Sequence, residues 1–146
     1  MKKLLPQANS LSTVIDVFIY VSTMSKWTLN DVADFCKFDV RQSSYYINAC
    51  HYLSLLNEDG TLSEDGKKII SNPSKIKEKV YQRVISDSLV SKVFARLLVE
   101  GESGLKDFTI NTIKEEYPEY SDAVIERRSS TLINWCIEIK DFITRK

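Results

Sequence analysis

The chain has 146 residues, enough for one ordinary domain or two small ones. Its 20 basic and 20 acidic residues cancel, so it is not a general polyanion binder, and any nucleic-acid site must be a local patch. Gly (4) and Pro (3) are scarce, which favours helices over a β-sandwich.

The three cysteines are an odd number without a CxxC pair, so we expect small core residues in a reducing compartment. No apolar run approaches the 18 or so residues that a spanning helix needs, and the first residues lack the long apolar region of a secretory signal. The sequence therefore predicts a cytoplasmic protein without a membrane segment.

Two segments of the chain nearly repeat each other. Residues 41–50 read RQSSYYINAC and residues 127–136 read RRSSTLINWC, with six of the ten positions identical in register. Such a repeat predicts one small module used twice.

The first copy is predicted to begin with a helix over 11–24, whose apolar stripe includes Val14 and Phe18. Thr28 and Asp31 have the spacing of a capping box for a short helix that ends near Cys36. Asp39 is a good N-cap for a third helix over 40–53. Two helices joined by a short turn predict a helix-turn-helix unit.

Asp59-Gly60 is a strong hairpin signal, and it predicts two short strands over 55–58 and 61–63. Ser63 can then cap a further helix. The expected fold is mainly α with a small β-hairpin wing, built as tandem helix-turn-helix or winged-helix modules.

Asn72-Pro73-Ser74 marks the predicted boundary between the two copies. We expect winged-helix module 1 over 1–73, a linker helix over 74–86, and helix-turn-helix module 2 over 87–146, which lacks a wing. In module 2, a short helix over 108–116 is predicted with Thr109 as its cap, and Ser121 is expected to cap a long helix over 121–142.

The runs FDVRQ (38–42), YYINA (45–49) and LSEDG (62–66) resemble a family of tandem winged-helix modules found in restriction endonucleases and related prokaryotic defence proteins. RRSSTLINW (127–135) resembles the second module of that family, and the similarity covers roughly residues 12–142. The resemblance implies a non-catalytic module that recognises double-stranded DNA in a restriction or defence system. In the family such modules usually lie beside a nuclease or ATPase domain, so the chain is expected either to stand alone or to be one domain of a larger protein.

The helix over 40–53 is the expected reader of the major groove, because arginine suits guanine and asparagine or glutamine suits adenine. Basic residues elsewhere are expected to hold phosphates, and the 59–60 hairpin to touch the backbone weakly through its acidic tip. The predicted DNA-binding residues are Arg41, Gln42, Ser43, Ser44, Tyr45, Asn48, Lys67, Lys68, Arg127, Arg128 and Ser129.

A protein–protein interaction or dimerisation module built on the same scaffold is the alternative, favoured by the neutral charge and acidic wing. A homodimer and an associated catalytic domain both stay open as partners. An autonomous enzyme is not expected, since the single His51 permits no histidine pair and no phosphate-binding glycine loop occurs. Glu138-Ile139-Lys140 is attributed to chance, and the acidic run at 57–66 cannot form a calcium loop, so neither a metal site nor a cofactor is predicted.

Overall fold

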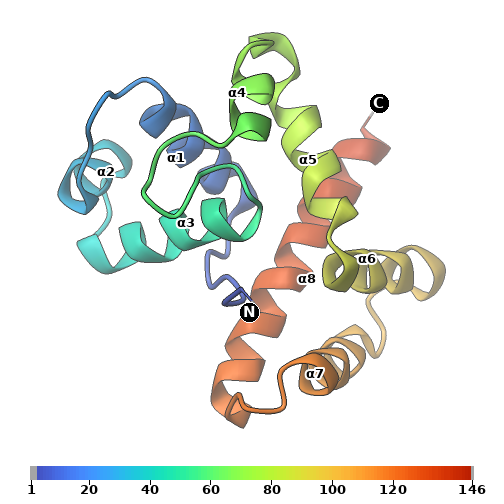
Figure 1. The fold of residues 1–146 in the computed structure, drawn as a ribbon. Helices are drawn as coiled ribbons and strands as arrows, with labels where there is room; N and C mark the ends of the chain where they lie inside the picture. Colours follow the sequence, from blue (N-terminus) through green and yellow to red (C-terminus); the bar gives the residue numbers. More distant parts are fainter. Residues whose placement is uncertain (1–2, 146) are drawn as a thin grey trace. The chain divides into compact units, whose positions relative to one another are not determined.

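The computed structural model describes residues 3–145, and within them the chain is helical (Figure 1). The bounds of the elements are α1 Leu11–Ser22, α2 Leu29–Cys36, α3 Val40–Tyr52, α4 Glu64–Ile70, the 3₁₀ turn η1 Pro73–Lys75, α5 Ile76–Ser86, α6 Ser88–Glu100, α7 Leu105–Glu116 and α8 Asp122–Thr144.

The chain folds as two compact units. Unit 1 contains residues 3–8 and 12–80 of the described chain, and unit 2 contains residues 9–11 and 81–145. The division falls inside α5, between Val80 and Tyr81, within the segment predicted as a linker helix over 74–86.

Side-chain caps begin four of these helices at the positions that the sequence indicated. The hydroxyl of Thr28 accepts from the backbone N–H of Asp31, and the Asp31 carboxylate accepts in return from the N–H of Thr28 at 2.9 Å. Asp39, Ser63 and Ser121 likewise accept from the third residue of their helices. Such caps satisfy N–H groups that have no partner within the helix.

The start of α7 was wrongly predicted. The helix begins at Leu105 after Gly104, which has a φ of 71°, and Thr109 lies buried in its second turn. The Thr109 hydroxyl donates back to the carbonyl of Leu105 at 2.8 Å. Threonine makes this bond inside helices as readily as it caps them, so its presence alone did not locate the helix start.

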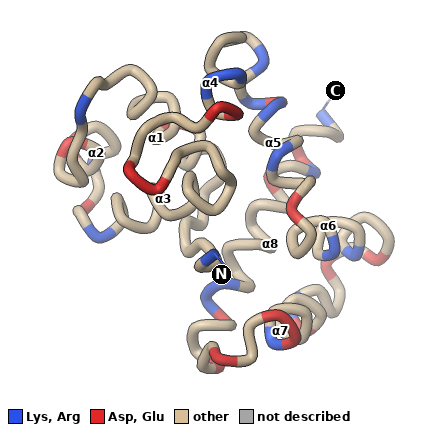
Figure 2. Tube along the Cα trace, viewed as in Figure 1, with Lys and Arg blue, Asp and Glu red and all other residues tan. Residues whose placement is uncertain are grey.

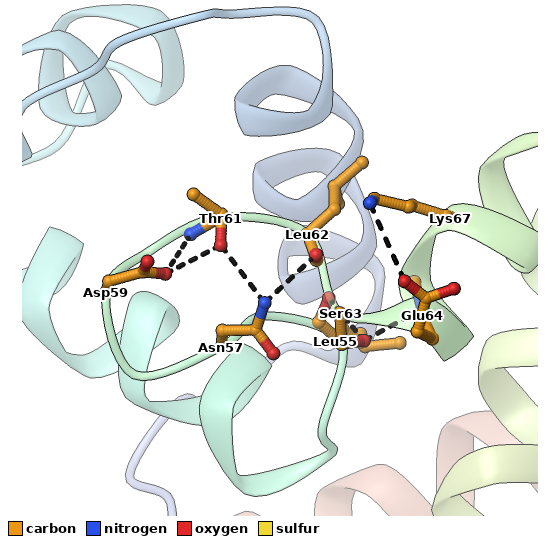
Figure 3. Close-up of polar contacts among 9 residues, drawn as sticks. Leu55, Asn57, Asp59, Thr61, Leu62, Ser63, Glu64 and Lys67 are labelled. Carbon is orange, nitrogen blue, oxygen red and sulfur yellow. Dashed lines mark hydrogen bonds and ion pairs between the residues drawn. The ribbon is translucent and has the colours of Figure 1, made fainter.

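The predicted β-hairpin wing is also wrong. No strand occurs in residues 3–145, and the 53–63 loop holds only one isolated antiparallel bridge, between Leu56 and Leu62. The backbone N–H of Asn57 donates to the Thr61 carbonyl at 2.7 Å, and that of Ser63 donates to the Leu55 carbonyl at 3.1 Å, which makes this single bridge. Figure 3 shows the side chains that bond within the same loop, such as the Asn57 amide, which donates to the Leu62 carbonyl at 3.2 Å. The pairing extends no further because Leu53 is the C-cap of α3 and Ser63 is already the N-cap of α4.

The repeat in the sequence corresponds to a repeat of packing. In unit 1 the thiol of Cys50 on α3 donates to the carbonyl of Val14 on α1 at 3.9 Å. In unit 2 the thiol of Cys136 on α8 donates to the carbonyl of Val90 on α6, also at 3.9 Å. Helices α1, α2 and α3 therefore correspond to α6, α7 and α8.

The same positions form the core of each unit. Phe18 and Phe94 lie 76 residues apart, as Val14 and Val90 do, and all four are buried. In unit 2 the core also contains Trp135, which has no exposed surface. Each unit thus has an apolar interior of its own, which is the physical basis for its compactness.

Candidate nucleic-acid interface

Helix α3 presents the candidate face, and the turn before it sets its start. Lys37 adopts a left-handed conformation with φ 61° and ψ 45°, which ends α2 and turns the chain into α3. Two residues later Asp39 accepts from the N–H of Gln42 at 3.1 Å. The sharp turn and the cap together explain why α3 begins at Val40.

The outward face of α3 carries most of the predicted residues. Arg41 and Ser44 are exposed, and Gln42, Tyr45 and Asn48 are partly exposed. Residues 41, 44, 45 and 48 follow the spacing of one helix face. The structure therefore places Arg41, Ser44, Tyr45 and Asn48 on one side of α3. We use the name α3 face for this set together with Gln42 and with Lys37, which lies in the turn before the helix.

Ser43 does not belong to this face, because its exposed fraction is 0%. It lies three, four and seven residues before Tyr46, Ile47 and Cys50, all of them buried. That spacing was readable in the sequence and places Ser43 on the inner stripe. A hydroxyl without accessible surface cannot contact DNA in this conformation.

The charge of the α3 face is mainly positive. Residues 40–57 contain no Asp or Glu, and the nearest carboxylate is that of Asp39, which caps the helix. Within the described chain neither Lys37 nor Arg41 makes an ion pair, and both cations are exposed to solvent. Lys37 was not among the predicted residues, because it lies in the turn between α2 and α3, where helix periodicity does not apply.

The predicted residues of α8 lie in a different setting. Arg127 is exposed and Arg128 partly exposed, but Ser129 has an exposed fraction of 0%. Because α8 begins at Asp122 after its predicted cap Ser121, Arg127 lies in the second turn of the helix.

Acidic residues accompany these arginines on α8. Glu126 pairs with Lys106 at 3.0 Å and Asp122 pairs with Lys114 at 3.8 Å, which ties the start of α8 to α7. The two copies of the repeat thus share their buried residues, but the start of α8 carries acidic residues that residues 40–57 lack.

Lys67 and Lys68 lie on α4, outside the α3 face, and both are exposed. Figure 2 shows basic residues along α4 and α5 and acidic residues in the preceding loop. Lys67 pairs with Glu64 at 3.7 Å (Figure 3). Hydrogen bonds from Thr61 lower the pKa of Asp59, whose carboxylate lies at the tip of the acidic loop.

The remaining chemistry of the described residues is limited. Burial raises the pKa of Cys50 and of Cys136 to about 12, so neither thiol forms a thiolate near neutral pH. No group of three or more potential metal ligands occurs among residues 3–145. None of the helices described has the length and apolar character that crossing a bilayer requires.

One comparison with known proteins gives a match. Residues 13–143 fit the profile of a family described as a domain of unknown function, DUF7226. No curated protein and no solved structure matches the chain. The family match spans both copies of the repeat, so the two copies together make up the unit that the family describes.

Proposed function

We propose that this chain, which belongs to the DUF7226 family of domains of unknown function, is a non-catalytic module that binds double-stranded DNA through the α3 face. The supporting observation is that an exposed helix, preceded by a tight turn, presents Arg41 beside Gln42, Ser44, Tyr45 and Asn48 with no acidic residue over 40–57. These are the side chains that pair with phosphates and base edges.

The helix dimensions support major-groove docking. An α-helix with its side chains fits the major groove of B-form DNA, and the first turns of such a helix contact the bases. Arg41 lies in the first turn of α3 and Asn48 two turns later. In the proposed complex Arg41 takes a guanine edge or a phosphate, Lys37 takes a phosphate, and Gln42 and Asn48 contact base edges.

Unit 2 has a secondary role in this proposal. Arg127 and Arg128 add phosphate contacts at most, because Glu126 and Asp122 lie on the same part of α8. Lys67 and Lys68 act in the same sequence-independent way. Ser43 and Ser129 contribute to packing alone, since both are buried.

The biological setting follows from the resemblance of residues 12–142 to recognition modules of restriction enzymes. On that basis we place the protein in a prokaryotic restriction or defence system in the cytoplasm, beside a partner that supplies catalysis.

The test is fluorescence anisotropy with labelled, randomised duplexes at about 50 mM and about 200 mM salt, where phosphate contacts differ strongly in strength. Wild-type protein is expected to bind at the lower salt. Arg41→Ala is expected to weaken binding by about tenfold, or about 1.4 kcal/mol.

The matched control is Lys92→Ala, which removes one exposed positive charge from unit 2, where Lys92 pairs with Glu116 at 3.3 Å. It is expected to leave the affinity nearly unchanged. Absence of binding at low salt would rule out the function, and equal effects of the two substitutions would rule out the α3 face as the binding surface.

A further inference from the structure

A groove with a volume of about 640 Å³ lies on unit 1, between the end of α1, the link to α2 and the 53–63 loop. Its walls combine apolar, aromatic and charged side chains. The lining residues are Val21, Ser22, Met24, Ser25, Lys26, Trp27, Thr28, Asp31, Asp59, Gly60, Thr61 and Leu62. None of them belongs to the α3 face.

Trp27 is held in this groove by the backbone of the loop. Gly60 has a φ of 89°, and a Cβ atom built on it would lie 2.9 Å from Cζ2 of the Trp27 ring. Only glycine combines this conformation with so close an approach. The Trp27 ring is partly exposed, so one part of its surface packs on Gly60 and another part is available to a ligand.

The groove also contains two carboxylates with free acceptor capacity. In Asp31 one oxygen accepts from the N–H of Thr28, and in Asp59 one oxygen accepts from Thr61, as Figure 3 shows for the second pair. Each carboxylate keeps its other oxygen for a further donor. Lys26 is the one cation of the lining, so the negative charges outnumber the positive and disfavour a phosphate-bearing ligand.

In unit 2 an aromatic ring and a carboxylate together hold an arginine side chain. Arg96 on α6 places its guanidinium 5.1 Å from the centre of the Phe108 ring and pairs with the carboxylate of Glu100. It also donates to the carbonyl of Ser103 at 3.4 Å. An aromatic face and a carboxylate together are a favourable site for a guanidinium group.

The groove of unit 1 is not the repeat counterpart of that arrangement. The shift of 76 residues that relates Val14 to Val90 places Tyr20 at the position of Arg96. Tyr20 stacks on Phe35 with ring centres 4.3 Å apart and is not part of the groove lining. Unit 2 therefore shows which groups hold a guanidinium, and in unit 1 the groove offers an aromatic ring and two carboxylates from other positions, without an arginine of its own.

We propose that this groove binds an arginine side chain of a partner protein, with the guanidinium against Trp27 and between Asp31 and Asp59. The apolar part of the arginine side chain packs on Met24 and Val21, which line the same groove. The site is separate from the α3 face, so it can bind a protein partner whether or not the chain binds DNA.

The experiment titrates the full chain with N-acetyl-arginine amide and follows the two tryptophan indole N–H signals by NMR. Trp135 is fully buried in unit 2 and serves as the internal reference. A saturable shift of the Trp27 signal alone is expected, whereas N-acetyl-citrulline amide, which is neutral and has nearly the same shape, leaves the signal in place. An equal response to citrulline or to inorganic phosphate, or no saturable response to arginine, overturns the proposal.

Two substitutions locate the site. Asp59→Asn keeps the oxygen that accepts from Thr61 but removes the charge, and is expected to weaken arginine binding about threefold. Glu58→Gln, a neighbouring carboxylate outside the groove lining, is expected to have no effect, and equal results for the two contradict the assignment. Neither substitution touches Arg41, so loss of DNA binding in Arg41→Ala with a normal arginine response distinguishes failure of one proposal from failure of the other.

Discussion

Ser43 and Ser129 occupy the same position of the repeat, and both are fully buried. The hydroxyl of Ser129 donates to the carbonyl of Glu126 at 2.7 Å, while the hydroxyl of Ser43 has no hydrogen-bond partner. Identity between the two copies at this position therefore reflects a shared small side chain at a tight helix contact. Residue type suggested a DNA contact here, but helix periodicity decides the direction of a side chain.

The backbone conformation of Lys37 leads to a prediction about stability and duplex binding. A side chain other than glycine costs about 1 kcal/mol or more in the left-handed conformation that Lys37 adopts with φ 61°. Lys37→Gly is therefore expected to raise the free energy of unfolding by about 1 kcal/mol in urea denaturation. The same change is expected to weaken duplex binding and to make its salt dependence shallower by about one phosphate contact.

Lys37→Asn is the control, because asparagine tolerates this conformation but carries no charge. It is expected to lose affinity as Lys37→Gly does. A glycine variant that gains stability and keeps full affinity would remove Lys37 from the α3 face.

At the scale of elements, α4 packs against the 53–63 loop through Gly66. A Cβ atom at this position would lie 2.3 Å from the carbonyl oxygen of Leu55. Replacing glycine by alanine inside a helix ordinarily stabilises it by about 1 kcal/mol. Here we expect the opposite, a loss of at least about 2 kcal/mol in the free energy of unfolding, because the backbone must move.

Gly101→Ala is the matched comparison, measured by the same urea denaturation. Its Cβ would meet nothing within 4 Å, so only the φ of 72° opposes it. With a ψ of −158° Gly101 adopts a conformation essentially restricted to glycine, so that strain is expected to cost about 1 to 3 kcal/mol. If Gly66→Ala instead stabilises the protein, as it would inside an ordinary helix, the close contact with Leu55 is not maintained in solution.

The helix caps and the 59–60 turn show how much of the secondary structure could be predicted from the sequence. Thr28, Asp39, Ser63 and Ser121 each cap the helix that the sequence assigned to them, because capping is decided by three or four neighbouring residues. The Asp59-Gly60 turn was recognised too. The flanking residues form only one bridge, because α3 ends at Tyr52 and Ser63 already caps α4. A turn signal indicates that the chain reverses, but it does not tell how many flanking residues pair.

The candidate site could likewise be predicted only in part. Helix periodicity indicated which residues of α3 are exposed, but it did not indicate Lys37, which lies before the helix. Glu126 on α8 pairs with Lys106 on α7, 20 residues earlier in the chain, so no local pattern indicated this ion pair. The groove around Trp27 likewise depends on a loop more than 30 residues away in the sequence.

At the scale of the whole molecule, unit 2 includes three residues from near the start of the chain. Thr131 donates to the side chain of Asn9 at 2.7 Å, and the backbone N–H of Leu11 donates to Glu138 at 2.6 Å. Glu138→Ala is expected to destabilise the protein by about 1.5 to 3 kcal/mol, since it removes a charged acceptor from a buried helix start.

Thermal unfolding checks this expectation against Asp141→Ala, an exposed carboxylate one turn further along α8. That control is expected to change the stability by less than about 0.5 kcal/mol. Equal midpoints for the two variants would contradict a structural role for the contact between Glu138 and Leu11.

The contact between Leu11 and Glu138 spans 127 residues, nearly the full length of the chain. During synthesis on the ribosome, residues 9–11 emerge well before α8, which follows α1 to α7 in the chain. We therefore expect unit 2 to be completed only once α8 has left the ribosome, whereas most of unit 1 can assemble earlier on the nascent chain. An early interruption of translation would release a chain whose first segment has lost the helix that it binds.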